Sequence, residues 1–556
     1  ANGKTPLFAA AKRGNITVVK ALESLGANVS LRTSEGASLV YVAAATNHLE
    51  LVKYFASRGV SITTQKHDGW TPLHAAASGG YLDVMQELVA LGANVTAVTK
   101  YEEAALQTAL GEGKLSVAQF LVNHGADINA MNKAGFTALN TATVFQDMNV
   151  IRLIVEVLGG DLRGRNGWNV TPMYYAANIG HTEVVKYLAS KGASVNVAVS
   201  FRWTPLHGAA TWAHTDTIRA LIELGADTSA LTDDDETVLH VALREHSNLP
   251  LVKMLVEEFG ALVNDNDRSR HSPLHIAAHR GHADIVQYLA PKSSNINAKD
   301  IEGLTALNVA ALRGHYSVVE ALLELGSAIN ISSNNGYTPL ANAALKNHSD
   351  VVKLLVRNHA DLQPFDDGFS LMHLACYAGN VEMIKFFDVL GVSVHAITRW
   401  GQVPAHYAAV SGCLECIITL VGLGASIDVM DNNHETPLFL SVSFGDVKMV
   451  EFLGQQSNHS VVNMRNISGS TPLWTAAAHG HTAVVAALLT LGADVDAADN
   501  KGHTPLFAAA SLGMLDSVKA LLAAHANPRI KDGEGLTPLL IAIQNKHDDV
   551  AALLSE

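Results

Sequence analysis

Cysteine is scarce in this chain, which has only Cys376, Cys413 and Cys416 among its 556 residues. So few cysteines exclude a fold that depends on a framework of disulfides. Cys413 and Cys416 form a single C-x-x-C pair, but a structural zinc site of that type needs a second pair. A thioredoxin-like redox motif needs a βαβ context, which is missing. We therefore expect both residues to serve in ordinary helix packing.

Long apolar runs and positive charge are also lacking. No run approaches the roughly 18 residues that span a membrane, which predicts no membrane insertion. The chain has 38 Lys and Arg against 52 Asp and Glu, a net charge of −14, and this balance disfavours nucleic acid and anionic membranes as partners. Residues 1–278 hold 22 basic and 26 acidic side chains and residues 279–556 hold 16 and 26, so neither half is a basic arm.

Catalytic motifs are missing as well. The sequence contains no P-loop, no dinucleotide-binding fingerprint, no nucleophile elbow and no kinase signature. It therefore offers no residue for a catalytic role, and we predict that the protein is not an enzyme and has no cofactor.

A repeated phrase organises the chain instead. Residues 471–503 read TPLWTAAAHGHTAVVAALLTLGADVDAADNKGH, and Thr504 begins the same phrase again. Thr471 is a good helix N-cap, Pro472 suits the first helical position, and Gly480 suits a helix end in the left-handed region. Apolar residues then recur at helical spacing from Val484. Each phrase predicts two short helices and a turn.

The phrase recurs at a nearly constant spacing over the whole chain. Twelve of the sixteen steps between successive Thr-like positions are 33 residues, and the others are 34, 35, 32 and 35. The seventeen positions are Thr5, Ser38, Thr71, Ala104, Thr137, Thr171, Thr204, Thr237, Ser272, Thr305, Thr338, Ser370, Val403, Thr436, Thr471, Thr504 and Thr537. This pattern resembles the ankyrin repeat, whose period is about 33 residues and whose signature is T-P-L-H-x-A.

The resemblance implies an all-α fold, an ankyrin-repeat solenoid in which helix-turn-helix units with β-hairpin loops stack into a curved superhelix. We predict a single solenoid of about 17 repeats over residues 1–556. Departures from the regular spacing and signature predict irregular hairpins near residues 157–168, 246–250, 262–271 and 455–466.

Most of the 26 histidines fit the repeat rather than a metal site. Two places in the repeat hold them, and the resemblance implies that histidines there form hydrogen bonds between loops. The fourth place of the signature holds His74, His207, His240, His275, His373 and His406. The place after the helix-ending glycine position holds His48, His181, His214, His282, His315, His348, His481 and His547. No H-E-x-x-H pair occurs among the others, so we predict no metal site.

Aromatic residues gather at places that, by resemblance, line the concave face of the solenoid. These places lie one and three residues before the Thr-like position and seven and eight after it. Exposed tryptophan and tyrosine are enriched where partners bind, so we predict a partner groove, with its main part on repeats three to seven. The predicted partner-binding residues are Trp70, Tyr101, Phe136, Phe145, Trp168, Trp203, Trp212, Tyr337, Phe369 and Trp400.

Two other interpretations of this region stay open. The rings could pack along the hairpins onto the next repeat. The basic residues that flank them, Arg163, Arg165 and Arg202, could take an acidic or C-terminal peptide.

The sequon N-x-S/T occurs eight times, about twice the roughly four that this composition predicts by chance. The candidate glycosylation sites are Asn15, Asn28, Asn94, Asn169, Asn330, Asn347, Asn458 and Asn466. Chance and drift are the alternative. We favour a cytoplasmic location, since the chain shows no signal peptide, with a secreted, glycosylated protein as the other possibility.

The function that fits best is a non-enzymatic scaffold that binds another protein or a peptide segment in a concave, aromatic-lined groove. A second hypothesis is a structural fibre subunit that associates end to end through its weakly capped first repeat. A third is the ankyrin segment of a larger receptor, channel or toxin.

Overall fold

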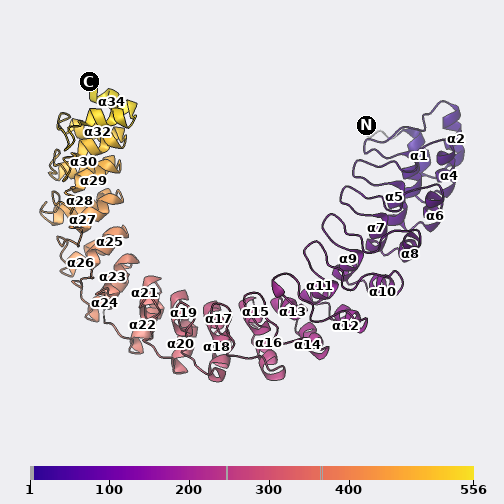
Figure 1. The fold of residues 1–556 in the computed structure, drawn as a ribbon, viewed down its shortest axis with the longest axis horizontal. Helices are drawn as coiled ribbons and strands as arrows, with labels where there is room; N and C mark the ends of the chain where they lie inside the picture. The colour runs from indigo at the N-terminus through magenta and orange to yellow at the C-terminus, as the bar shows by residue number, and fades with distance from the viewer. Residues whose placement is uncertain (1–4, 246–247, 364, 366, 556) are drawn as a thin grey trace. The chain divides into compact units, whose positions relative to one another are not determined.

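The computed structural model describes residues 5–245, 248–363, 365 and 367–555. These residues form α-helices in consecutive pairs (Figure 1). Within them no strand occurs, and the one isolated β-bridge joins Val98 to Ala104. In the same part of the chain, no helix combines the length and the apolar character that a membrane span requires.

The first helix of each pair begins directly after a Thr-like position. The first helices are α1 (Pro6–Lys12), α3 (Leu39–Ala45), α5 (Pro72–Gly79), α7 (Ala105–Gly111), α9 (Ala138–Phe145), α11 (Pro172–Asn178), α13 (Pro205–Thr211), α15 (Val238–Glu245), α17 (Pro273–Arg280), α19 (Ala306–Arg313), α21 (Pro339–Leu345), α23 (Leu371–Tyr377), α25 (Pro404–Val410), α27 (Pro437–Ser443), α29 (Pro472–Ala478), α31 (Pro505–Ser511) and α33 (Pro538–Gln544).

In most pairs the second helix is longer than the first, but α16 and α18 are shorter than the helices they follow. The second helices are α2 (Ile16–Ser24), α4 (Leu49–Ser57), α6 (Leu82–Ala90), α8 (Leu115–Asn123), α10 (Met148–Glu156), α12 (Thr182–Ser190), α14 (Thr215–Glu223), α16 (Leu249–Lys253), α18 (Ala283–Leu289), α20 (Tyr316–Glu324), α22 (Ser349–Arg357), α24 (Val381–Val389), α26 (Leu414–Gly422), α28 (Val447–Gln456), α30 (Thr482–Thr490), α32 (Leu515–Ala523) and α34 (Asp548–Ser555). Short 3₁₀ segments are η1 (Ser200–Arg202) and η3 (Ala290–Lys292), and η2 (Met254–Glu258) is a π-helical turn.

The chain divides into two compact units, which we call unit 1 (residues 1–276) and unit 2 (residues 277–556). Within each unit the first helices of successive pairs pack on one another, and so do the second helices. Figure 1 shows these as two rows, with odd-numbered helices in one row and even-numbered helices in the other. The core of each unit is therefore the apolar layer between neighbouring repeats rather than one central mass.

The predicted capping chemistry explains where the first helices begin. The Thr471 hydroxyl accepts the Trp474 N–H at 3.2 Å, and Pro472 occupies the first turn. Ala104 has no hydroxyl, but α7 still forms, because the Gln107 side chain accepts the Ala104 N–H at 3.0 Å. A side chain three residues into the helix thus replaces part of the missing cap.

Single backbone hydrogen bonds join the turns of neighbouring repeats. The His67 N–H donates to the Glu35 carbonyl at 3.0 Å, and the Asn432 N–H donates to the Trp400 carbonyl at 2.8 Å. One such bond at a junction is too little for a strand ladder, so the hairpin loops stack as tight turns.

Most histidines at the two repeated places form the expected bonds between loops, but Nε2 of His207 is buried without a hydrogen-bond partner among the described residues. At the fourth place, His74 Nδ1 lies 2.8 Å from the Thr71 hydroxyl and Nε2 lies 3.1 Å from the Glu103 carbonyl of the next repeat. After the glycine position, His214 Nε2 lies 3.2 Å from the Asn178 carbonyl of the preceding repeat. The same bonds recur at His240, His373 and His406, and at His48, His181, His315, His348, His481 and His547.

Two of the four segments predicted to be irregular lie in or near the second helices of unit 1. At 157–168, the extra residue follows α10, where the Gly160 N–H donates to the Ile154 carbonyl at 2.9 Å. At 246–250, residues 246 and 247 lie outside the described residues. There the second helix continues from α16 into η2, and a π-turn absorbs one extra residue in a helix.

The other two segments differ in outcome. At 455–466, the insertion is irregular as expected, and it buries Val461 and Val462 in the core. At 262–271, the turn is regular, contrary to the expectation. The Asp267 N–H donates to the His271 carbonyl at 3.0 Å, as the equivalent residues of other hairpins do.

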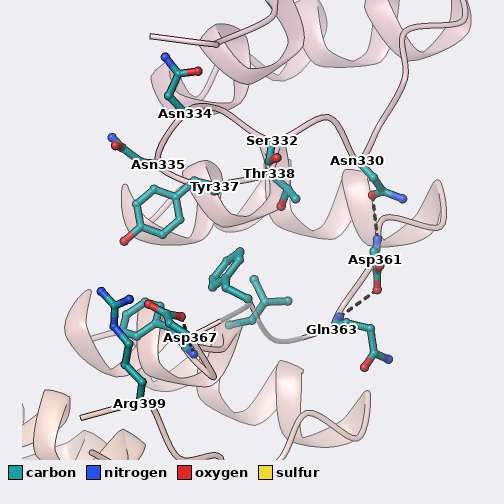
Figure 2. A pocket seen from close by; sticks show the side chains of 14 residues that line it. Asn330, Ser332, Asn334, Asn335, Tyr337, Thr338, Asp361, Gln363, Asp367 and Arg399 are labelled. Carbon is teal, nitrogen blue, oxygen red and sulfur yellow. Dashed lines mark hydrogen bonds between the residues drawn. The ribbon is translucent and has the colours of Figure 1, made fainter.

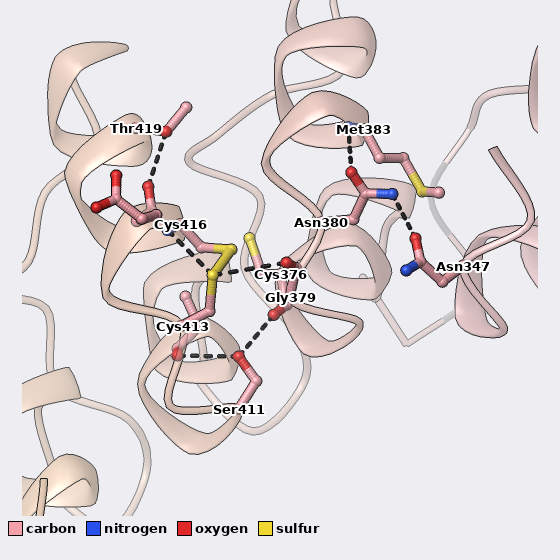
Figure 3. Close-up of a disulfide and its surroundings, with 11 residues drawn as sticks. Asn347, Cys376, Gly379, Asn380, Met383, Ser411, Cys413, Cys416 and Thr419 are labelled. Carbon is pink, nitrogen blue, oxygen red and sulfur yellow. Dashed lines mark hydrogen bonds between the residues drawn. A yellow bond between two sulfur atoms is a disulfide. The ribbon is translucent and has the colours of Figure 1, made fainter.

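Cys413 and Cys416 form a disulfide (Figure 3), so the expectation that they serve only in helix packing is wrong. Cys413 is the N-cap residue of α26, and its Sγ accepts the Cys416 N–H at 3.2 Å. The N-cap and third helical positions face one another at a helix start, which brings the two sulfur atoms together. Cys376, in α23, is a buried free thiol.

Candidate functional site

The aromatic rings predicted to bind a partner separate into two groups by their place in the repeat. Rings one residue before the Thr-like position are half-buried or buried. Phe136 lies 5.1 Å from Trp168 and 5.6 Å from Tyr175 of the next repeat, measured between ring centroids. Phe369 is only 9% exposed and packs 5.1 Å from Tyr407. At this place the rings do pack onto the neighbouring repeat.

The first group therefore contributes little free surface. Trp70 and Trp203 are half-buried, each about 6.0 Å from the histidine at the fourth place of its own repeat. Tyr337 is also half-buried. Phe369 as it lies cannot offer its ring to a partner, which removes it from the predicted set.

Rings at the other places are exposed. Phe145 and Phe201 are each 72% exposed, and Trp212 is 57% exposed. The remaining exposed rings in this group are Tyr101, Trp168, Tyr377, Trp400 and Phe444. In unit 1 they stand on the turns before α7, α11 and α13 and at the ends of α9 and α13, within the repeats three to seven that the sequence indicates.

One of the flanking arginines, Arg165, is engaged within the protein. The Arg165 guanidinium donates to the carbonyls of Asn169 and Ala198, each at 3.1 Å, so it ties its own turn to the next one. This bonding leaves less of Arg165 for an acidic peptide.

A cleft opens between α7 and α9 in unit 1, and we call it the α7–α9 cleft. Its volume is about 310 Å³, and its lining includes Trp70, Glu103, Gly111, Phe145 and Asp147. Gly111 is one reason for the opening, because a Cβ added there would have no heavy atom within 4 Å. Ala138 and Ala142 of α9 also line it and add little bulk. The Glu103 side chain is half-buried, and burial raises the pKa of its carboxyl.

A second hollow, of about 550 Å³, lies in unit 2 between the turns at 330–337 and 361–369 (Figure 2). The step from Thr338 to Ser370 is the one 32-residue step of the chain, so the second turn is one residue short. Figure 2 shows Tyr337, Asp367 and Arg399 together at one side and Asn330, Asp361 and Gln363 at the other. The side-chain carbonyl oxygen of Asn330 accepts a hydrogen bond from the backbone N–H of Asp361 at 2.9 Å.

The described residues also bear on metal binding and on glycosylation. They contain no group of three or more His, Cys, Asp or Glu arranged to hold a metal ion. Seven of the eight sequon asparagines are exposed, while Asn466 is half-buried and donates to Glu435 at 3.2 Å. Glycosylation of these sites stays a prediction, which the intact mass of natural material would test.

A family model described as ankyrin repeats, in three copies, matches the chain throughout. The matched segments are 1–66, 41–132, 128–199, 157–231, 197–267, 239–333, 274–366, 325–396, 371–462, 456–532 and 498–556. The chain belongs to the ankyrin-repeat family and is an all-α ankyrin-repeat solenoid.

Among curated proteins, the chain is similar to the probable 26S proteasome regulatory subunit p28 of Saccharomyces cerevisiae, with 35% identity over 144 residues. That match covers 25% of this chain and 63% of the relative. It is also similar to human NF-kappa-B inhibitor alpha, with 30% identity over 142 residues, which are 24% of this chain and 45% of the relative. The chain thus spans less than two thirds of each of these relatives.

The sequence does not single out three features of the α7–α9 cleft. Glu103, Gly111 and Glu112 line it, but none of them belongs to a motif. The available signal was the degenerate fourth repeat, in which Ala104 replaces the capping hydroxyl and glycine stands seven residues later. At the place seven residues after the Thr-like position, the sequence pattern draws attention to large aromatic rings, whereas the feature that matters at Gly111 is the lack of a side chain.

Proposed function

We propose that this chain is a non-enzymatic scaffold that binds another protein through unit 1. The observation that carries the proposal is the set of exposed rings at Phe145, Phe201 and Trp212, which we call the unit 1 ring set. Keeping large apolar rings exposed to water costs free energy, so a surface that presents several of them gains free energy when a partner covers them.

The repeat architecture suits this role. Each ring stands on a short helix or turn that is bonded to its neighbours, so little conformational entropy is lost when a partner binds. The names of the similar proteins agree with such a role, since one is a regulatory subunit of the proteasome and the other an inhibitor of NF-kappa-B. A partner segment lying along the rings could be extended or helical.

A matched pair of variants tests the proposal. One replaces the unit 1 ring set by alanine, and the other replaces Tyr377, Trp400 and Phe444, the unit 2 ring set. Affinity capture from the natural source, quantified by mass spectrometry, should show a partner lost by the first variant and kept by the second. Unchanged circular dichroism is the check on folding. If both variants keep every captured protein, the rings are not the binding surface.

Self-association through the first repeat is a second candidate, because that repeat leaves apolar side chains in contact with solvent. Leu25 is 83% exposed, and Val18 and Leu31 are each more than 40% exposed. Head-to-tail contacts that do not close would build filaments. Light scattering of the pure chain should then show mass that rises with concentration, and a Leu25→Ser, Val18→Ser variant should not. A monomer at all concentrations would refute this candidate.

A further inference from the structure

The α7–α9 cleft has carboxylates in its lining and no basic side chain. Glu103, Glu112 and Asp147 line it, and neither Lys nor Arg does. Within the described part of the chain, none of the three carboxylates forms an ion pair. The charge of the cleft is therefore uncompensated by the protein itself.

The three acidic residues are positioned by the elements that carry them. Asp147 is the N-cap of α10, where Oδ1 accepts the N–H groups of Asn149 at 3.0 Å and Val150 at 3.1 Å. Glu103 precedes α7, and its backbone carbonyl is bound by His74. Glu112 is the C-cap residue of α7. The Asp147 carboxylate is therefore fixed at the cleft, and the backbone places Glu103 and Glu112 in its lining.

The ends of two helices add to this field. α7 ends at Gly111 and α9 ends at Phe145, and both residues line the cleft. The carboxyl end of a helix carries partial negative charge and favours a cation. Both helices are short, so we take this contribution as secondary to the three carboxylates.

The cleft also has an apolar side. Phe145 is largely exposed, Trp70 is half-buried, and both line the cleft, as Gly111 does. A lysine or arginine side chain matches such a site, because its methylene groups can lie on apolar surface while its charged end meets carboxylates. The cation also gains from the face of an aromatic ring. An acidic or neutral side chain would gain neither interaction.

We propose that the α7–α9 cleft receives a lysine or arginine side chain of the protein partner, with apolar partner residues beside it on Phe145. This inference rests on the proposed function and narrows the partner to a segment in which a basic residue is flanked by apolar ones. It is the opposite of the acidic peptide that the flanking arginines suggest.

The test starts from a random library of displayed twelve-residue peptides, selected on the whole chain. Selected peptides are then synthesised and their binding is measured by fluorescence anisotropy. We expect them to carry Lys or Arg next to apolar residues, and to bind more weakly as salt is raised. The triple variant E103Q/E112Q/D147N should bind them at least tenfold more weakly, and D147N keeps the cap of α10 because Asn also caps helices well.

Three controls sharpen this test. The variant E183Q/D216N removes two exposed carboxylates from α12 and α14, outside the cleft, and should bind the peptides as the natural chain does. Replacing the basic residue of the peptide by Gln should weaken binding as much as the triple variant does. The two changes together should weaken binding little more than either one alone, because they remove the same interaction. Gly111→Met, which fills the cleft at a position open to a side chain, should also abolish binding without loss of helix.

The outcomes separate the two proposals. Selected peptides without basic residues, or binding to the triple variant within twofold of the natural chain, would overturn the inference. If such peptides still lose binding in Phe145→Ala and Trp212→Ala, the inference fails while the unit 1 ring set stands. If no peptide is selected, or if binding ignores rings and carboxylates alike, both proposals fail.

Discussion

Unit 1 and unit 2 are built from the same module but differ in what they leave on the surface. Unit 1 has 22 basic and 26 acidic residues, a net charge of −4, and unit 2 has 16 and 26, a net charge of −10. Yet the cleft without a basic side chain lies in unit 1, while the hollow in unit 2 includes Arg399. The total charge of a unit therefore does not reveal the charge around its hollow.

The exposed rings show the same contrast. Among the described residues, unit 1 has five aromatic rings that are more than half exposed, and unit 2 has two, Tyr377 and Phe444. The five in unit 1 are Tyr101, Phe145, Trp168, Phe201 and Trp212. Since the buried positions of the two units are alike, the difference between them is a difference of surface and not of core.

The largest expected effect would test whether the cores are equivalent. Phe55 in α4 and Phe387 in α24 stand 17 residues after the Thr-like position of their repeats, and both are fully buried. Phe55→Ala and Phe387→Ala should each lower the free energy of unfolding by about 3–5 kcal/mol, since each leaves a cavity. Urea unfolding followed by circular dichroism measures both.

Hydrogen exchange gives the matching local measurement for these two variants. Loss of protection should be largest in the altered repeat and its neighbours, because repeats contact only adjacent repeats. The two cores are not equivalent if one variant loses several-fold less hydrogen-exchange protection than the other.

The pH dependence should be shared by both units. Burial lowers the pKa of His207 in unit 1 and of His373 in unit 2 to about 4 from the ordinary 6.5. Between these values the unfolded chain binds more protons than the folded one. Stability is therefore fully present above about pH 6.5 and falls as pH drops towards 4, on the order of 3 kcal/mol for each histidine.

Asparagine provides the control for this pH effect, because the chain already uses it at the fourth place. Asn308 accepts from the Thr305 hydroxyl at 2.7 Å and donates to the Tyr337 carbonyl at 3.4 Å. His207→Asn and His373→Asn should therefore keep the fold and flatten the loss of stability between pH 6.5 and 4. An unchanged slope in both variants would assign the acid sensitivity to other groups.

A reducing agent should distinguish the units, since the disulfide Cys413–Cys416 lies in unit 2 and unit 1 contains no cysteine. The closed loop is short, so its loss should lower stability by at most about 2 kcal/mol. Thermal unfolding with and without dithiothreitol measures this, and Cys413→Ser should abolish the dithiothreitol effect. An effect that persists in that variant would mean that the disulfide is not its source.

The smallest expected effect concerns helix caps. Thr436 in unit 2 caps α27 by accepting the Phe439 N–H at 3.3 Å, whereas Ala104 in unit 1 has no hydroxyl. Thr436→Ala should lower the free energy of unfolding by about 1 kcal/mol. Ala104→Thr should raise it by less than that, because Gln107 already replaces part of the cap. Urea midpoints measure both changes. If Ala104→Thr lowers the free energy of unfolding instead, the new hydroxyl cap and the Gln107 side-chain cap compete with each other.

Local signals in the sequence predict the helices well. The Thr-Pro pairs and the glycines act within one turn of a helix, so their effect does not depend on the rest of the fold. Sequence reasoning also places the histidines correctly, because the repeat gives each of them the same neighbours. Cys413 and Cys416 were harder, since a three-residue spacing is compatible with packing, a metal or a bond.

The aromatic surface marks the limit of that reasoning. Phe136 and Phe145 both stand at places that the repeat assigns to one face, but Phe136 packs onto Tyr175 while Phe145 remains exposed. The difference depends on the side chains of the adjacent repeat. A period of 33 residues specifies which repeat is adjacent, but not the volume of the side chains that it places against a given ring.

The sequence by itself determined the module, its spacing and the ends of its helices, because those depend on contacts within a few residues. Only the tertiary structure decided which rings are covered, that Gly111 leaves a cleft between α7 and α9, and that Glu103, Glu112 and Asp147 line it. These features arise where two repeats meet, and packing between repeats depends on side chains that are about 33 residues apart in the chain.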